Sequence, residues 1–313
     1  MKKLLSRVSR RVWSIGIYAG NSPVDLAPPP FVANPVLTRE SITDVPAAFV
    51  ADPFMVRVDG GWYMFMEVMA SRPGSTKGEI GLATSQDGYR WSYQRIVLAE
   101  AFHLSYPYVF EWNSDYYMIP ESSDAGGVRL YRADPFPVHW VFVKNLLTGP
   151  VFLDSSIFQR DGTWWMLTAT SPNKYTHDTL RLFGAPDPLG PWNEHPRSPV
   201  VRGDRRIARP GGRVVCTPDR VIRFSQDCRR LYGSSGHMYA MEITRLTARD
   251  YQEAPIGSGP VLAGGASGWN RAGMHHADPV RLEEGRWIAC VDGWYEQLRS
   301  PVELLRSALR RWG

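Results

Sequence analysis

Cysteine, long apolar runs and cofactor-binding loops are scarce or missing in this sequence. The chain of 313 residues contains only three cysteines, Cys216, Cys228 and Cys290. Their odd number and the lack of metal-ligand spacing argue against a disulfide framework and favour a reducing compartment. The sequence also has no phosphate loop, dinucleotide fingerprint or nucleophile elbow, so none of the chemistries that depend on those motifs is indicated.

Membrane-spanning and exported proteins are disfavoured as well. No stretch approaches the ~20 apolar residues of a transmembrane helix. The N-terminus superficially resembles an export signal, but Arg7, Arg10 and Arg11 interrupt its apolar part. We therefore expect a cytoplasmic protein.

Basic residues are concentrated at the two ends of the chain. Residues 1–12 and 296–313 together carry a charge of +7, which leaves −2 for the rest of a chain whose net charge is +5. A basic groove for nucleic acid is therefore not expected across the body of the protein. The basic ends favour peripheral contact with an anionic membrane, at its inner face if the protein is cytoplasmic.

What the sequence does contain is a repeated hairpin pattern. In each repeat a polar residue opens a strand, a turn follows, and a strand rich in aromatic and β-branched residues returns. Turns such as Asp59-Gly60 and Asp161-Gly162 are typical of tight hairpins. The five repeats start at Asp52, Tyr106, Asp154, Gly211 and Asp278, and read DPFMVRVDGGWYMFME, YPYVFEWNSDYYMIPE, DSSIFQRDGTWWMLTA, GGRVVCTPDRVIRFSQD and DPVRLEEGRWIACVDG.

Second hairpins, for example in residues 79–97 and 179–195, complete each repeat as a four-stranded sheet. Arranged radially, such sheets bury their apolar faces against one another. We predict an all-β protein, a five-bladed β-propeller over residues 45–295, with a basic segment and a ring-closing strand in residues 1–44. A sandwich with irregular repeats is the alternative. The first strands of a propeller line its axis, so one mouth of the channel is expected to gather Asp52, Tyr106, Asp154, Arg209 and Asp278.

Several motifs follow the order found in a known family, from FVADPF, GEIGLATSQDG, HLSYPYVFEW and MIPESS to LDSSIF, GGR, QDC and HHADPV. In these motifs the sequence resembles the N-terminal domain of plant glucosamine inositolphosphorylceramide transferase and its bacterial stand-alone relatives. In the plant proteins the glycosyltransferase catalytic domain follows the propeller, and we expect no such domain in this sequence. The resemblance therefore implies a fold and does not by itself imply an activity.

A more distant resemblance is to the five-bladed glycosidases of families 43 and 32. It implies that Asp52, in ADPF, is a base or nucleophile and that Asp154, in LDSSIF, tunes the pKa of the general acid. The blade-four glutamate that serves as general acid in those families has no counterpart here, because the sequence reads IARPGGRVV and then SQDC. This departure argues against ordinary glycoside hydrolysis.

Two more carboxylates follow the apolar runs YMFM and YYMIP on the return strands of the first two blades. A carboxylate in such a place must be solvated, paired or functional. We predict that Glu121 replaces the missing acid, so that the catalytic residues are Asp52, Asp154 and Glu121, and that Glu67 binds substrate. A structural ion pair is the alternative for Glu121.

Three histidines are predicted to contact a sugar or phosphate: His103, His275 and His276. Adjacent strand residues face opposite sides, so only one member of the His275-His276 pair is expected to face the channel. No third strong ligand is visible beside them, and no metal site is assigned.

Arg209 and Arg213 flank Pro-Gly-Gly, where a ligand can approach the backbone and an arginine fork suits phosphate. We predict that both bind substrate, together with Tyr106 and Asp278, and that Asp227 is a further binding residue that pairs with one arginine. An inter-blade salt bridge is the alternative for the arginines. The tryptophans of the return strands are expected to lie mostly in the core between blades.

Residues 296–313 are predicted to form a short amphipathic helix. Ser300 to Glu303 reads as a capping box with Pro301 at the first helical position. The apolar stripe comprises Leu298, Val302, Leu305, Leu309 and Trp312. Such a helix would pack on the side of the propeller or contact an anionic membrane.

These features favour glycosyl transfer in the assembly of a cell-surface polysaccharide or glycolipid. The predicted partner is a carbohydrate or glycolipid substrate, with a nucleotide sugar as the candidate donor, and no cofactor is assigned. The alternatives are a glycoside hydrolase using Asp52 and Glu121, and a non-catalytic propeller that presents a glycan to another enzyme.

Overall fold

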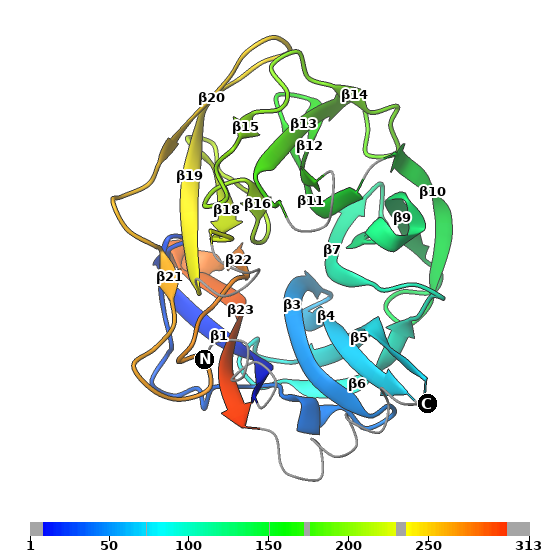
Figure 1. The fold of residues 1–313 in the computed structure, drawn as a ribbon, viewed down its shortest axis with the longest axis vertical. Coiled ribbons are helices and arrows are strands. Elements are labelled where there is room, and N and C mark those ends of the chain that lie inside the picture. The colour runs from blue at the N-terminus through cyan, green and yellow to red at the C-terminus, as the bar shows by residue number, and fades with distance from the viewer. Residues whose placement is uncertain (1–8, 73, 150, 172–175, 230–235, 299–313) are drawn as a thin grey trace.

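The predicted five-bladed propeller is confirmed by the structure, a computed structural model that describes residues 9–72, 74–149, 151–171, 176–229 and 236–298. Five antiparallel sheets surround a common centre (Figure 1). Within the described ranges the only helices are three short 3₁₀ turns, and none is long and apolar enough to span a membrane. These turns are η1 (Arg39–Ser41), η2 (Ser123–Ala125) and η3 (Glu283–Gly285).

Each blade is a sheet of neighbouring hairpins. The first comprises β3 (Ala47–Val58), β4 (Gly61–Arg72), β5 (Ser75–Ser85) and β6 (Ser92–Leu98). The second comprises β7 (Ser105–Trp112), β8 (Asp115–Glu121), β9 (Gly127–Ala133) and β10 (Trp140–Thr148). The third comprises β11 (Val151–Arg160), β12 (Thr163–Ser171), β13 (Thr179–Ala185), β14 (Asn193–Glu194) and β15 (Val201–Arg202).

The fourth blade is the least regular and starts with the very short strands β16 (Arg209–Pro210) and β17 (Val215–Cys216), which both pair with β18 (Val221–Gln226). It continues with β19 (His237–Leu246), β20 (Tyr251–Pro255) and β21 (Leu262–Ala263). The fifth blade is assembled from both ends of the chain, namely β22 (Ala277–Arg281), β23 (Trp287–Leu298), β1 (Ser9–Ser22) and β2 (Asp25–Ala27).

Ring closure depends on pairing between the two ends of the chain. Strand β1 pairs with β23 in an unbroken antiparallel register from Ser9 opposite Leu298 to Gly20 opposite Trp287. Residues 296–298, which we expected to open a C-terminal helix, are therefore the last residues of β23. This part of the prediction is wrong because backbone pairing with β1 holds these residues in an extended conformation. The rest of the predicted helix lies outside the described residues.

The apolar core lies between the blades. One cluster joins Ile15 and Ile288 of the fifth blade to Trp62, Met64 and Met66 of the first. Trp62, Trp165 and Trp287 are all buried, which confirms that these return-strand tryptophans pack in the core. Burying one such side chain stabilises the fold by about 2–3 kcal/mol, so the blades hold one another in a fixed arrangement around the centre.

Candidate functional site

A β-bulge near the start of the first strand recurs in three blades. The pairing of β3 with β4, of β7 with β8 and of β11 with β12 shifts register between Ala51 and Phe54, Ser105 and Tyr108, and Leu153 and Ser156. The residues inside these bulges have left-handed backbone angles, with φ of 51° at Asp52, 47° at Tyr106 and 52° at Asp154. Such angles are unfavourable for residues other than glycine, and they concentrate at functional positions. A bulge also re-aims a side chain, so the same local device places all three at the centre.

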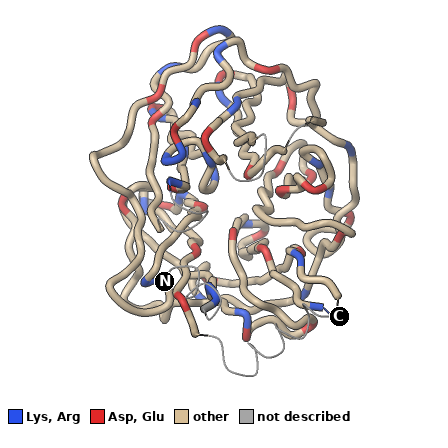
Figure 2. The backbone as a smooth tube through the Cα atoms, viewed as in Figure 1, with Lys and Arg blue, Asp and Glu red and all other residues tan. Residues whose placement is uncertain are grey.

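Above these bulges lies a cavity of about 650 Å³, here called the first cavity. Acidic positions recur on the strands nearest the centre of the ring (Figure 2). The cavity contains residues of all five blades, among them five of the predicted site residues. Its lining comprises Arg10, Arg11, Trp13, Phe49, Ala51, Glu67, Met69, His103, Ser105, Glu121, Ser123, Asp124, Leu153, His177, Arg209 and His275.

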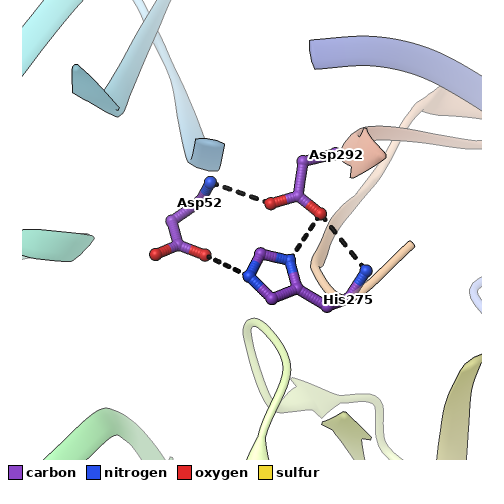
Figure 3. A group of neighbouring side chains, drawn as sticks. All are labelled: Asp52, His275 and Asp292. Carbon is purple, nitrogen blue, oxygen red and sulfur yellow. Dashed lines mark hydrogen bonds and ion pairs between the residues drawn. The ribbon is translucent and has the colours of Figure 1, made fainter. Parts of the chain in front are cut away.

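Asp52, His275 and Asp292 form a hydrogen-bonded group beside this cavity (Figure 3). The Nδ1 atom of His275 lies 2.7 Å from Asp292 Oδ1, and its Nε2 atom lies 3.5 Å from Asp52 Oδ1. The other oxygen of Asp292 accepts a hydrogen bond of 3.0 Å from the backbone amide of Asp52. Trp13 packs on the imidazole with ring centroids 4.2 Å apart. One carboxylate thus fixes both the bulged backbone and the histidine that faces Asp52.

Burial and charge set the protonation of this group. Burial raises the pKa of Asp52 to about 7, although His275 opposes the shift. Burial alone would lower the pKa of His275, but the carboxylates of Asp292, Asp52 and Asp154 together outweigh it and the pKa is raised. Burial would raise the pKa of Asp292, but the two histidines and the hydrogen bond from the Asp52 amide together outweigh it and the pKa is lowered. Near neutral pH, Asp52 and His275 can therefore exchange a proton while Asp292 stays ionised.

The same three residues could each offer one ligand atom to a metal ion, since these atoms lie within 4.8 Å of one another. Both ring nitrogens of His275 already face carboxylates, so a metal would have to replace one of those contacts. Proton exchange between Asp52 and His275, in contrast, needs no change in these contacts.

Asp154 and Arg209 form a buried ion pair next to Asp52. Arg209 donates from Nε to Asp154 Oδ2 at 2.6 Å and from a terminal nitrogen to Oδ1 at 3.2 Å, while Gln226 donates to Oδ2 at 2.7 Å. Arg209 also lies 3.1 Å from Nδ1 of His177, which must accept because a guanidinium can only donate. Burial, aided by Arg209, lowers the pKa of His177 to about 3. Arg209 therefore neutralises Asp154 and also lines the first cavity, and its phosphate-binding role stays a prediction.

Glu67, Glu121 and His103 line the wall of the first cavity. Burial raises the pKa of Glu67 well above its usual range, and the charges of Asp52 and Glu121 add to the shift. The amide of Gly78 donates to Nδ1 of His103 at 2.9 Å, so the neutral ring carries its proton on Nε2, which lies 3.5 Å from Glu67 Oε1. Glu121 accepts from the Ser123 amide at 2.7 Å and from the Ser105 hydroxyl at 3.3 Å.

Tyr106 and His276 lie beneath the floor of the cavity and do not face it. The Tyr106 hydroxyl donates to the carbonyl of Gly212 at 2.9 Å and accepts from the amide of the same residue at 2.8 Å. His276 packs edge-on against Phe54 and Tyr106, and burial lowers its pKa to about 3. Substrate contact by these two residues is therefore not supported. Only His275 of the histidine pair faces the cavity, as expected for adjacent residues.

The glycines before Arg213 serve the fold. Gly212 has a φ of 136°, and a side chain there would clash with the backbone carbonyl of Ala277, 1.7 Å from the added carbon. The close approach expected at this Gly-Gly is thus made by the neighbouring blade, and not by a ligand.

Asp278 and Arg213 are not at the predicted mouth. Asp278 is completely buried. Its carboxylate accepts a hydrogen bond of 2.6 Å from Arg213 Nε and one of 2.7 Å from the Met55 amide of the first blade. The pairing of β22 with β23 has no bulge, so nothing turns Asp278 towards the first cavity. His275, three residues earlier, takes that place. Asp227 is not among the residues that line the first cavity, and its carboxylate accepts a hydrogen bond of 2.6 Å from Arg229.

Several site residues were not anticipated, including Asp292, Gln226 and His177. The first two could have been found from the repeat, because Glu67, Glu121, Gln226 and Asp292 each lie five residues after a large apolar residue near the start of a return strand, namely Trp62, Tyr116, Val221 and Trp287. His177 follows the third blade's return strand and carries no comparable sequence signal.

Comparison with known proteins agrees with this architecture. Residues 7–294 match the family described as glucosamine inositolphosphorylceramide transferase 1, N-terminal. The chain is 37% identical over 300 residues to a protein of that name from Oryza sativa subsp. japonica and 35% identical to one from Arabidopsis thaliana, covering 90% of this chain in each case. It spans only 40% and 39% of those relatives' lengths.

Solved structures share the fold at low sequence identity. A thermostable family-43 glycoside hydrolase superposes with a TM-score of 0.62 at 14% identity, covering 86% of this chain and 96% of that one. The β-1,2-mannobiose phosphorylase of Listeria innocua gives a TM-score of 0.61 at 12% identity, covering 93% and 98%. At such identities the likeness establishes the propeller fold alone. The sequence match over nearly the whole described chain shows more: this protein belongs to the glucosamine inositolphosphorylceramide transferase 1 N-terminal domain family.

Proposed function

We propose that this chain is a carbohydrate-active propeller that catalyses glycosyl transfer in the assembly of a cell-surface polysaccharide or glycolipid. The observation that carries the proposal is the pair of carboxyl groups at the first cavity. The pKa of Asp52, which faces His275, is about 7. The pKa of Glu67 is raised well above the usual value for a glutamate, so Glu67 keeps its proton. Glycosyl chemistry needs one carboxylate that takes a proton and one carboxylic acid that donates it. The name of the plant relatives, a transferase, supports transfer.

In the proposed reaction Asp52 accepts the proton of an acceptor hydroxyl as its oxygen forms a bond to the sugar carbon. The bond from that carbon to the leaving oxygen breaks, and Glu67 gives its proton to this oxygen. The proton on Asp52 can pass to His275, whose imidazolium Asp292 stabilises. When the donor is a nucleotide sugar, the leaving group is its nucleotide phosphate, which needs protonation by the acid less than the alcohol leaving group of a glycoside does.

Glu67 replaces Glu121 as the proposed acid. Glu121 accepts hydrogen bonds with both oxygens, from Ser105 and Ser123, and is proposed to hold the wall of the cavity beside Glu67. Asp154 is proposed to act through Arg209 and Gln226 as a positioning residue, since these contacts fix the floor next to Asp52.

The test is turnover of nucleotide sugars and glycosides with hydroxyl acceptors, with products identified by mass. Asp52→Asn is expected to reduce kcat by roughly a hundredfold or more with a much smaller change in KM, as for a positioned base. Glu67→Gln should slow glycoside donors far more than nucleotide sugars and remove the fall in rate at alkaline pH. Asp161→Asn removes an exposed carboxylate in a hairpin turn and is the matched control, with activity unchanged.

Two outcomes would replace the proposal. Release of free sugar with water as the acceptor would make the protein a glycoside hydrolase using the same two residues. Saturable glycan binding without turnover of any donor would make it a glycan-presenting module. Full activity of Asp52→Asn on a substrate that does turn over would remove Asp52 from the mechanism. We further propose a cytoplasmic location, which fractionation of expressing cells would test.

A further inference from the structure

A second cavity, of about 430 Å³, lies further along the innermost strands and shares no lining residue with the first. On β3 the first cavity is lined by Ala51 and the second by Met55, Val56 and Arg57. At the usual rise per residue of a strand, these three residues lie about 13–20 Å along β3 from Ala51. The cavities are therefore at different levels of the propeller. The second is lined by Met55, Val56, Arg57, Glu111, Tyr116, Arg213, Val214, Val215, Cys216, Pro279, Val280, Arg281 and Trp287.

Arg213 forms a rigid inner wall of the second cavity. Its guanidinium donates to Asp278 at 2.6 Å and to the Val109 carbonyl at 3.1 Å, and it lies over the Tyr108 ring at 4.8 Å. Asp278 is itself fixed by the Met55 amide. The Arg213 side chain keeps 19% of its surface exposed and lines the cavity, so its positive charge is close to any ligand there. An arginine held in this way loses little freedom when it binds an anion.

Arg57 and Arg281 bring additional positive charge to the rim from neighbouring blades. Both are exposed, and within the described part of the chain neither has a carboxylate partner. Arg57 lies over the Trp62 ring at 5.8 Å, which orients it without neutralising it. Among the described lining residues Glu111 is the single acid, and it accepts from Tyr116 at 3.4 Å. Since Asp278 balances Arg213, the rim retains an excess of positive charge.

We propose that the second cavity binds a small molecule bearing phosphate groups, at a site separate from the first cavity. Guanidinium forks match the geometry of phosphate oxygens and bind them in bidentate fashion. The volume falls within the range of small-molecule sites, roughly 300–1,000 Å³. The ligand engages Arg57 and Arg281 with its phosphate oxygens and rests against the exposed part of the Arg213 side chain.

Calorimetric titration of the full chain with inorganic pyrophosphate, at low ionic strength and pH 8, tests this site. We expect saturable one-to-one binding, and at least tenfold weaker binding for the double variant Arg57→Gln/Arg281→Gln. The control, Arg197→Gln/Arg249→Gln, removes the same charge from exposed arginines elsewhere and should bind like the parent. Asp52→Asn should also bind like the parent, because Asp52 lies beside the first cavity and does not line the second.

Both substituted arginines are exposed, so the thermal midpoint of the double variant should match that of the parent and exclude unfolding as a cause. Absence of saturable binding to the parent would overturn the proposal. So would an equal loss in the control variant, because that would show attraction to net charge alone. None of these results depends on glycosyl transfer at the first cavity.

Discussion

Replacing Asp52 by asparagine should make the protein more stable at alkaline pH. Folding raises the pKa of Asp52 from 3.8 to about 7, because burial penalises its charge. The folded state therefore binds this proton more tightly than the unfolded state does, and the resulting stability is lost as pH rises from 3.8 to 7. At 1.36 kcal/mol per pKa unit, the charge costs roughly 4 kcal/mol at pH 8 and roughly 1.5 kcal/mol at pH 5.

Asparagine keeps the shape, carries no charge and can donate to His275 as the protonated carboxyl would. The gain in unfolding free energy should thus be about 2.5–3 kcal/mol larger at pH 8 than at pH 5. At about 2 °C per kcal/mol for a chain of this size, the gain in Tm should differ by roughly 5 °C between the two pH values. Differential scanning calorimetry of parent and variant at both pH values measures this. An equal gain at pH 5 and pH 8, or a loss at pH 8, would refute the reasoning.

Two other parts of the chain give predictions of different kinds. Arg209→Ala should destabilise the fold by about 3–5 kcal/mol, because it leaves Asp154 buried without its cation. A denaturant midpoint equal to that of the parent would contradict this. The control is Arg249→Ala, at an exposed position. The basic ends should cause salt-sensitive co-sedimentation with anionic liposomes. A chain shortened to residues 9–298 keeps both closing strands, and undiminished binding by it would show that the ends are not responsible.

The sequence by itself determined the features that arise within one hairpin. Asp-Gly turns and aromatic return strands are local patterns, so the residues alone identify the blades around Asp52, Tyr106 and Asp154. The carboxylates that follow the apolar runs of the return strands are also visible in the sequence, since a charge after an apolar run is a local anomaly. The same rule applied to the fifth blade would have found Asp292.

Only the tertiary structure decided which of these side chains share a cavity. Asp278 was predicted beside Asp52, yet without a bulge it points to Arg213, and sequence patterns do not reveal whether a strand carries an extra residue. The amide of Asp52 is fixed by Asp292, 240 positions away, and that contact exists because β1 and β23 close the ring. The raised pKa of Asp52 follows from burial created by that closure, so it is a property of the assembled propeller and of no single segment.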